Sequence, residues 1–478
     1  YKARLCARGF TQKYGIDYDE TFAACMNIKT LRVLLAIAAR DNVVAYQYDV
    51  STAFLHAPLD HEVYVEQPEG FDIPGYPRER YVYKLKRAMY GLKNAGYAWS
   101  NFFMSTLKDL GFKQNWKDDC LWTLCKGKYY VHYLFHVDDI LCVSNNDELR
   151  TQTYKRLEKR VDIKDEGEVK KFLAMRIERL EDGSYTLDQT KYIEKIAKKF
   201  KVDEYEKKKK GVVKTPGDFN GSRLTKDSLP KRTEERQQAI KLDMPALVGS
   251  LIYTIRTRPD VAYAISDIAR FMGEWGINHY NQALRILSYL HNTKDKKIYI
   301  RRDLVNDMTL TIYVDANYGD ERESVHADDR LMSQGGYCLF LGGVLVSWHS
   351  HRQKLRVLSS MEAEYVEASE ATKEVIWARG LLDELGYTQT QPTIMYEDNK
   401  ACIDYIKTGK INERNKHIDT KKYFAKDKYK EKIIDIKHIA TEKQLADLNT
   451  KFILQHSFFS FVDKLFNGVD DHELYVKS

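Results

Sequence analysis

The stretch HYLFHVDDILCVS, residues 132–144, decides how the N-terminal part of the chain is expected to fold. Two apolar runs flank the adjacent carboxylates Asp138 and Asp139, and each run is typical of a buried strand. The join between the runs is short enough only for a tight turn, so a β-hairpin is predicted. Aspartate is common in turns because its side chain bonds nearby backbone amides. From this stretch alone, two interpretations remain open: the acids have a structural role in the turn, or they are a functional pair.

A second strand-like run, VVAYQYDV, ends near Asp49. If this strand is a neighbour of the hairpin, Asp49, Asp138 and Asp139 meet at one edge of a sheet. Three carboxylates in that position can hold two divalent ions against a nucleoside triphosphate and a primer hydroxyl. Spacing along the chain does not establish by itself that the strands pair.

The chain has 478 residues, of which 43% are hydrophobic and 30% charged. This composition is typical of a soluble globular protein, and at roughly 100–200 residues per domain it predicts two to four domains. The formal net charge is +7, which is compatible with a polyanionic partner but does not identify one.

Seven cysteines are scattered along the chain, without a CxxC pair followed by a second Cys or His pair. Neither a zinc site nor a disulfide framework is indicated, and a reducing intracellular compartment is predicted. The sequence has no apolar stretch as long as a membrane span and no signal peptide, so no membrane association is expected. The start YKARLCARGF lacks Met, which predicts a fragment or a processed piece of a longer protein.

The middle of the chain contains a basic stretch with few apolar residues, followed by three segments with a helical pattern. Residues 204–236 are basic and almost free of apolar side chains, which predicts an exposed loop or linker. The three segments ALVGSLIYTI, DVAYAISDIARFM and NQALRILSYL follow, and each has a helical pattern.

From residue 308 onward, short strands and one long helix are predicted. GYCLFLGGVLVSW contains two strand runs joined at Gly342-Gly343, which is a hairpin signal. The last predicted helix, TEKQLADLNTKF, opens with a capping box formed by Thr441 and Gln444. The order of elements predicts a compact mixed α/β domain of about 150 residues. The other predicted elements are MTLTIYVDA, SSMEAEYVEASEATKEVIWARGLLDELG, TIMY, ACIDYIK and IIDIKHIA.

Four carboxylates of this domain stand at or near the ends of predicted elements: Asp315, Glu362, Asp398 and Asp447. Each has a structural alternative, since Glu362 follows Ser359 by three residues as in a capping box and aspartates are common in turns. One acid per element end nevertheless gathers negative charge at one point, and such a group needs cations. Oxygen ligands suit Mg²⁺ or Mn²⁺, and two such ions about 3.5–4 Å apart support phosphodiester hydrolysis. A metal site is the favoured interpretation.

Several long motifs resemble a known family. KARLCARGFTQKYGIDYDETFA, YDVSTAFLHAPLDHEVYVEQPEGF, VYKLKRAMYGLKNAGYAW and HVDD are similar to the reverse transcriptase of copia-type LTR retrotransposons. LVGSLIYTIRTRPDVAYAIS, YVDANYGD, SSMEAEY, EDNKACI, NKHIDTKKYF and TEKQLADLNTK are similar to the connection and ribonuclease H of the same polyprotein. The similarity covers nearly the whole chain in order, and the chain is identified as a member of this family.

The resemblance implies an α+β right-hand polymerase, with palm, fingers and thumb, followed by a ribonuclease H-like α/β domain. The implied domains are fingers and palm at 1–182, thumb and connection at 183–306, and ribonuclease H at 307–455. Residues 456–478 are expected to be a C-terminal tail.

The resemblance also implies the catalytic, metal-binding residues, with two Mg²⁺ ions per site and Mn²⁺ as an alternative. The polymerase acids would be Asp49, Asp138 and Asp139. The ribonuclease H acids would be Asp315, Glu362, Asp398 and Asp447.

Four residues are implied to bind the nucleotide. Phe54 would crowd the sugar 2′ position and exclude ribonucleotides. Lys2 and Arg4 would lie in the segment whose basic residues meet the triphosphate, and Asn94 in the segment over the template and nucleotide. His417 belongs to the family's KHID signature, and its role is left open.

The implied activity is that of an RNA-directed DNA polymerase with ribonuclease H activity. The implied partners are an RNA template, a DNA or tRNA-like primer, an RNA/DNA hybrid and dNTPs, in a cytoplasmic virus-like particle. The primer, the oligomeric state and whether protease and integrase regions precede Tyr1 are left open.

Three departures from the family pattern favour an alternative. His136 stands where the family usually has Tyr, and Asn94 and Gly96 replace the usual Gln and Pro. The alternative is a decayed or repurposed copy that binds nucleic acid without polymerase activity and retains at most the hybrid-specific nuclease.

Overall fold

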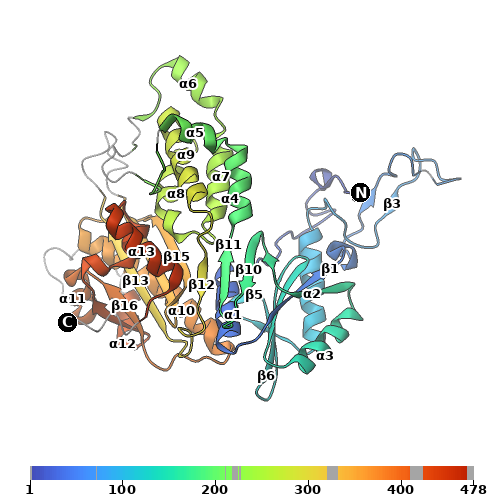
Figure 1. Cartoon of the computed structure of the whole chain (residues 1–478). Coiled ribbons are helices and arrows are strands. Elements are labelled where there is room, and N and C mark those ends of the chain that lie inside the picture. The colour runs from blue at the N-terminus through green and yellow to red at the C-terminus, as the bar shows by residue number, and fades with distance from the viewer. Residues whose placement is uncertain are drawn as a thin grey trace. The chain divides into compact units, whose positions relative to one another are not determined.

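The chain divides into two compact units, and each is described by itself. Unit 1 comprises Tyr1–Leu34 and Val43–Phe172, and unit 2 comprises Leu35–Asn42 and Leu173–Ser478. Figure 1 traces both units in the computed structural model. The structure describes residues 3–71, 73–209, 211–217, 224, 228–319, 332–409 and 424–470.

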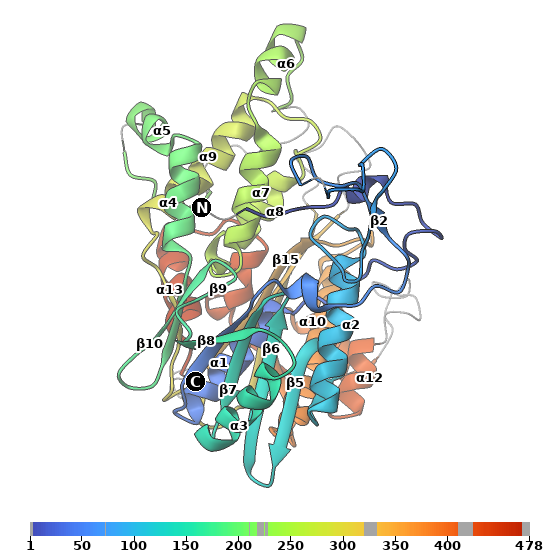
Figure 2. The same ribbon diagram turned by 90° about the vertical axis from the view of Figure 1, so that its right-hand side faces the viewer.

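Unit 1 is built on a six-stranded sheet with the order β4-β5-β6-β7-β1-β8, and Figure 2 shows β5, β6 and β7 next to one another. Its strands are β1 (Ala45–Val50), β4 (Lys113–Asn115), β5 (Asp118–Lys126), β6 (Tyr129–His136), β7 (Asp139–Ser144) and β8 (Ile163–Glu168). Its helices are α1 (Ile28–Arg40), whose last residues count with unit 2, α2 (Ala95–Asp109) and α3 (Asp147–Glu158). Its short elements are η1 (Gly9–Thr11), η2 (Ala53–His56), β2 (Tyr64–Val65), β3 (Tyr83–Lys84) and β9 (Lys171–Phe172).

Strands β6 and β7 form the predicted hairpin. They pair antiparallel, with His136 opposite Asp139 at the turn. Residues 131–135 of β6 and 140–144 of β7 are buried without interruption, which explains why both runs are mostly apolar. Helix α2 packs on the hairpin through Phe103 and Phe135, whose ring centroids are 5.0 Å apart.

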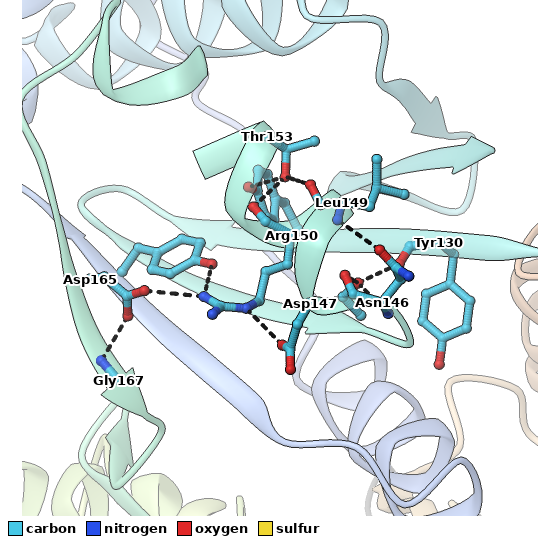
Figure 3. Close-up of polar contacts among 11 residues, drawn as sticks. Tyr130, Asn146, Asp147, Leu149, Arg150, Thr153, Asp165 and Gly167 are labelled. Carbon is cyan, nitrogen blue, oxygen red and sulfur yellow. Dashed lines mark hydrogen bonds and ion pairs between the residues drawn. The ribbon is translucent and has the colours of Figure 1, made fainter. Parts of the chain in front are cut away.

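Arg150 of α3 ties this helix to strands β1 and β8, as Figure 3 shows. Its guanidinium donates to the Tyr48 hydroxyl at 3.1 Å, to Asp165 at 3.1 Å and to Asp147 at 3.3 Å. The same guanidinium lies 3.8 Å from the centre of the Tyr46 ring. Arg150 therefore holds in place the strand that carries Asp49.

Two glycines allow the N-terminal segment to lie directly on the loop before α2. The Ala7 amide donates to the Tyr90 carbonyl at 2.7 Å. A Cβ on Gly9 would lie 1.9 Å from the Gly91 carbonyl oxygen, and Gly91 itself has a φ of +93°. Neither position can accept a side chain without separating the two segments.

The first part of unit 2 is helical. The three helices predicted after residue 236 are present, and they pack on one another. Part of the basic stretch 204–236 is also helical, since α5 and α6 extend into it. The helices are α4 (Thr190–Lys199), α5 (Val202–Lys209), α6 (Thr233–Ile240), α7 (Met244–Thr254), α8 (Ala262–Ala269) and α9 (Ile277–Asn292). The strands β10 (Met175–Arg179), β11 (Tyr185–Asp188) and β12 (Ile298–Ile300) pair antiparallel in that order.

The second part of unit 2 is a mixed five-stranded sheet with helices, as predicted. The sheet order is β15-β14-β13-β16-β17, in which β13 to β15 pair antiparallel and β16 and β17 are parallel to β13. The strands are β13 (Leu310–Asn317), β14 (Gln334–Leu341), β15 (Val344–Arg352), β16 (Thr393–Glu397) and β17 (Ile434–His438). The helices are α10 (Ser360–Glu384), α11 (Lys400–Thr408), α12 (Phe424–Lys430) and α13 (Gln455–Asn467).

The prediction of a helix over TEKQLADLNTKF is wrong. The segment forms two 3₁₀ turns, η6 (Thr441–Lys443) and η7 (Leu445–Asn449), separated by Gln444 in an extended conformation. The buried Gln444 amide donates to the Val314 carbonyl at 2.8 Å and to the Tyr396 carbonyl at 3.3 Å. These bonds to two strands outweigh the local helical preference and interrupt the helix.

Residues 456–478, expected to be a tail, contain most of α13. Its side chains Phe458, Phe461 and Leu465 are buried in the same core as residues of α7 to α9 and of β13 to β15. The helical and α/β parts of unit 2 therefore share one hydrophobic core. In the described ranges, none of the helices combines the length and apolarity needed to cross a membrane.

We expect Gly336→Ala to destabilise unit 2 by about 1–3 kcal/mol, because a Cβ in a packed core forces its neighbours apart. That Cβ would lie 2.5 Å from the Asn449 Cβ, in the turn next to Asp447. The matched control is Gly249→Ala in α7, where a Cβ meets nothing within 4 Å and the helix gains up to about 1 kcal/mol. Urea unfolding of both variants checks the difference, and equal midpoints would contradict it.

Candidate active site

In unit 1, Asp49 lies directly opposite Asp139 in the antiparallel pairing of β1 with β7. The strand pairing that the sequence could not establish is therefore present. The Gln47 amide donates to Asp139 Oδ1 at 3.0 Å, and the Val50 amide donates to the Asp138 carbonyl at 2.8 Å. The Gln47 side chain and the Val50 backbone, both in β1, thus fix the two acids of the hairpin turn.

Val137 occupies an unusual backbone conformation at this turn. Its φ is +56°, which is rare for a β-branched residue and costs about 1–3 kcal/mol. The indole N–H of the buried Trp99 donates to the Val137 carbonyl at 2.7 Å. Helix α2 therefore holds the strained turn that presents Asp138 and Asp139.

The three acids of unit 1 differ in exposure. Asp138 is exposed, while Asp49 and Asp139 are half-buried. Burial raises the pKa of Asp139, the bond from Gln47 opposes that rise, and the charges of Asp138 and Asp49 add to it. The three carboxylates are not one of the described groups whose ligand atoms all lie within 4.8 Å of one another.

The predicted nucleotide-binding residues Arg4 and Phe54 both contact Tyr90. The Arg4 guanidinium lies 5.4 Å from the centre of the Tyr90 ring, and the Phe54 ring packs against it at a centroid distance of 5.2 Å. Sequence reasoning missed Tyr90. Lys2 lies outside the described residues. Nucleotide binding by these residues stays a prediction.

Asn94, also predicted to meet the nucleotide, is only 1% exposed. Its side-chain oxygen accepts a hydrogen bond from the Gln12 amide at 3.3 Å. Gln12 in turn accepts from the backbone amide of Lys93 at 2.7 Å. In this conformation Asn94 joins the N-terminal segment to the start of α2, and its contact with a nucleotide stays a prediction.

In unit 2, three carboxylates converge where parallel strands end. Tyr313 of β13 is paired with Tyr396 of β16, so Asp315 and Asp398 follow at matching positions. Glu364, from the first turns of α10, completes the group. One oxygen from each of these three side chains lies within 4.8 Å of the others. The Ala316 amide donates to Glu364 Oε2 at 2.6 Å and fixes the direction of that carboxylate.

The structure places Glu364, and not the predicted Glu362, in this group. Glu362 accepts a hydrogen bond from the Leu358 amide at 2.9 Å, and its own amide donates to Ser359 Oγ at 3.2 Å. Glu362 therefore has the capping role that the sequence left as its alternative. The helix turns by about 100° per residue, so only one of two acids spaced by two residues can face the sheet end.

Residues of the motif TEKQLADLNTK also contact the carboxylates of this group. Asp447 lies in η7, and the Thr450 hydroxyl donates to Asp315 Oδ2. The Thr441 hydroxyl donates to Asp398 Oδ2 at 2.7 Å. The Lys451 ammonium is 2.8 Å from Asp447 Oδ1 and 3.7 Å from Asp315 Oδ2. Of the residues in this motif, sequence reasoning named only Asp447 as a site residue.

Burial dominates the electrostatics of this group. It raises the pKa of Asp315, although Lys451 opposes the rise, and it raises the pKa of Glu364 well above its ordinary value. Burial and the charge of Asp315 raise the pKa of Asp447 to about 8. Burial alone would lower the pKa of Lys451, but the charges of Asp315 and Asp447 outweigh it and raise that pKa. Burial therefore favours the neutral forms of Asp315, Glu364 and Asp447.

A further buried acid, Glu367, lies one helical turn after Glu364. It is 0% exposed, and burial raises its pKa to about 8. Its Oε2 atom is 3.5 Å from His351 Nε2. A neutral Glu367 is the form that this environment favours at neutral pH.

His417 lies outside the described residues. Asp203, Glu206 and His291 also bring ligand atoms within 4.8 Å of one another, at a partly exposed position on α5 and α9. Glu206 accepts hydrogen bonds from Ser288 at 2.6 Å and from Asn292 at 3.1 Å.

Comparison with known proteins identifies the family. Residues 1–214 match the family described as reverse transcriptase (RNA-dependent DNA polymerase). The chain is 34% identical to a retrovirus-related Pol polyprotein from transposon TNT 1-94 of Nicotiana tabacum, over 96% of this chain and 33% of that protein. It is 31% identical to a putative transposon Ty5-1 protein of Saccharomyces cerevisiae, over 68% of this chain and 100% of that protein. The chain belongs to the Pol polyprotein family of copia-type retrotransposons.

The copia-type resemblance seen in the sequence is thereby confirmed, and the family is one of enzymes. The chain spans about a third of the length of the Pol polyprotein from Nicotiana tabacum. Among solved structures, it is 12% identical to the N-terminal ribonuclease H domain of Rv2228c from Mycobacterium tuberculosis, fused to maltose-binding protein. That match covers 33% of this chain and 97% of the other with a TM-score of 0.22, which is too low to support an argument.

We expect Glu364→Gln to weaken Mn²⁺ binding at the unit 2 group by at least about tenfold, because a charged ligand is lost. Glu362→Gln is the matched control, since a glutamine oxygen still accepts the bond from Leu358 and the affinity should stay within about twofold. Calorimetric Mn²⁺ titration in an Asp138→Asn background checks both. Equal losses in the two variants would contradict the assignment of Glu364.

We expect Glu367→Gln to reduce the pH dependence of folding stability. Because the folded-state pKa of about 8 lies above the ordinary value of 4.5, the stabilisation is complete below pH 4.5 and is lost as the pH rises through 8. The difference between wild type and Glu367→Gln should therefore change by up to about 1.4 kcal/mol per pH unit in that window.

Urea unfolding from pH 5 to pH 9 measures this difference. His351, Glu370 and Asp315 act on the pKa of the same carboxyl or lie against it, and they are unchanged in both proteins. Asp383→Asn, near the end of the same helix, serves as the control, since Asp383 is not among the groups that act on the pKa of Glu367. A pH profile of Glu367→Gln parallel to that of wild type would show that Glu367 is not protonated in the folded state.

Proposed function

We propose that this chain is an RNA-directed DNA polymerase that also cleaves the RNA strand of an RNA/DNA hybrid. The observation that carries the proposal is the convergence of Asp315, Glu364 and Asp398, with Asp447 beside them, in a member of a reverse transcriptase family. Its partners would be an RNA template, a DNA or tRNA-like primer and dNTPs. Contacts with phosphates would make binding salt-dependent and largely independent of sequence.

The unit 2 residues fit a divalent cation. All the ligands are carboxylate oxygens, which Mg²⁺ and Mn²⁺ prefer. Burial raises the pKa of Asp315 and of Glu364, and a bound cation would offset the cost of their charges. When bound, such an ion supplies a nucleophilic water and stabilises the charge on the leaving oxygen. The chain's own residues orient the ligands, since the Ala316 amide holds Glu364 and the Thr441 hydroxyl holds Asp398.

In unit 1, Asp49, Asp138 and Asp139 would hold two divalent ions against the triphosphate and the primer end. The hairpin supports this role because Trp99 and Val50 bind the turn through the backbone of Val137 and Asp138. Unit 1 would supply the palm and fingers, α4 to α9 the thumb and connection, and β13 to β17 with their helices the ribonuclease H domain.

A second candidate is a protein that keeps only the hybrid-specific nuclease. Three observations favour it. The unit 1 carboxylates do not gather within 4.8 Å as the unit 2 group does, and His136 stands next to the strained turn. The buried Asn94 is a third difference from an open nucleotide site. The two candidates predict different results for DNA synthesis and the same result for hybrid cleavage.

We expect Asp138→Asn to reduce primer extension on an RNA template at least about a hundredfold, and Asp398→Asn to reduce hybrid cleavage similarly, because each removes a charged metal ligand. Each variant should leave the other activity intact. Asp119→Asn and Glu362→Gln are the matched controls for the two units.

Primer extension with Mg²⁺ or Mn²⁺ and cleavage of a labelled hybrid measure the two activities. Hybrid cleavage without any extension in the wild type would support the nuclease-only candidate. Loss of both activities in either single variant would refute separate centres.

A further inference from the structure

Gln47 lies on strand β1, two residues before Asp49. Because side chains alternate along a strand, Gln47 and Asp49 are on the same face of the sheet. Tyr46 and Tyr48 are on the opposite face, where the Arg150 guanidinium lies 3.8 Å from the Tyr46 ring centre and donates to the Tyr48 hydroxyl at 3.1 Å. Strand β1 is also paired on both sides, with β7 and with β8. The backbone that carries Gln47 is therefore firmly held.

From this position the Gln47 side chain reaches the acid at the start of β7. Asp139 is opposite Asp49 in the antiparallel register, so both carboxylates are on the face that Gln47 shares. The Gln47 side-chain amide donates to Asp139 Oδ1 at 3.0 Å. Asp138 and Asp49 place like charges near Asp139. The bond from Gln47 therefore opposes a repulsion that would turn the Asp139 carboxylate away from its neighbours.

We propose that Gln47 is a positioning residue of the unit 1 centre, which holds Asp139 Oδ1 so that the other oxygen, Oδ2, is directed to a divalent cation. The proposal rests on the proposed function, which assigns divalent ions to these acids. Gln47 acts through Asp139 and does not bind the cation itself. Carboxylates that bind metal ions are commonly hydrogen-bonded by neighbouring groups that fix their direction.

Two features of this bond carry the proposal. In the part of the chain that the structure describes, the amide of Gln47 is the sole side-chain donor to the Asp139 carboxylate, so no second side chain would replace it. The amide is also neutral and can donate without adding charge. A lysine or arginine in the same place would compete with a cation for the carboxylate, whereas glutamine orients Asp139 and leaves its full charge for the ion.

Mn²⁺ titration followed by EPR tests the proposal without measuring activity. All proteins carry Asp315→Asn, which removes a ligand of the unit 2 group, and the ions of the unit 1 centre are those lost when Asp138→Asn is added. Gln47→Met keeps the length of the side chain but lacks the donor, and we expect it to weaken Mn²⁺ binding at this centre at least about tenfold. The matched control is Gln114→Met on β4, where the amide donates to Asp119. This control should keep the Mn²⁺ affinity within about twofold.

Repeating the substitution in an Asp139→Asn background distinguishes positioning from a merely structural role. If Gln47 acts through Asp139, Gln47→Met should weaken Mn²⁺ binding there by less than about twofold further. A further loss of about tenfold in that background would overturn the proposal, as would a loss below about threefold where Asp139 is kept. Gln47→Thr, which suits a strand but cannot reach Asp139, is read by the same outcomes if Gln47→Met does not fold.

Primer extension on the same preparations separates this inference from the proposed function. Gln47→Met should raise the Mn²⁺ concentration for half-maximal extension at least about tenfold and keep the rate at saturating Mn²⁺ within about threefold, because all three acids remain. Extension with an unchanged Mn²⁺ dependence in Gln47→Met would mean that the function holds and the role of Gln47 fails. Weakened Mn²⁺ binding in Gln47→Met, without extension by any of the proteins, would mean the reverse.

Discussion

The repulsion among carboxylates that are buried together governs the architecture of unit 2. Two charges 4 Å apart interact by about 4 kcal/mol even at an effective dielectric constant of 20, and Asp315, Glu364 and Asp447 are each at most 5% exposed. The fold meets this cost with donors from separate parts of the chain: the Ala316 amide, the Thr441 and Thr450 hydroxyls and the Lys451 ammonium. The turns that carry these donors are in turn fixed to the sheet by the amide of Gln444. The last segment of the sheet domain is thus shaped by the electrostatics of the site rather than by its own helical preference.

Much of the fold follows from periodicity and from local signals. The hairpin around Asp138, the apolar helices of unit 2 and the mixed sheet after residue 308 were all predicted, because apolar runs and turn residues specify them locally. The segment after Thr441 was not, since the bonds of Gln444 to strands more than 40 residues away are invisible to local patterns. The role of α13 was missed for the same reason. Its apolar side chains pack in a core formed by elements that are distant in the sequence, and a local pattern does not show that packing.

The candidate site was predicted in part. Asp315 and Asp398 could be placed at strand ends, and the parallel pairing of β13 with β16 brings them together. The choice between Glu362 and Glu364 depends on the residue at which the helix begins, because one residue changes the direction of a side chain by about 100°. The sequence pattern matched a capping box, and in the structure Glu362 binds at the helix start, where its amide donates to Ser359 and its carboxylate accepts from the Leu358 amide. Tyr90 and Lys451 gave no local signal, since each acts through contacts with distant residues.

The left-handed backbone of Val137 has a mechanical consequence for the acids that follow it. Glycine at this position would relieve the strain, but it would also let the loop sample many shapes. Valine admits few alternatives, and the indole of Trp99 selects one of them. The strained turn therefore lowers folding stability slightly but restricts the positions that Asp138 and Asp139 can take. A more flexible loop at the same place would let the two carboxylates vary in position relative to Asp49 on β1.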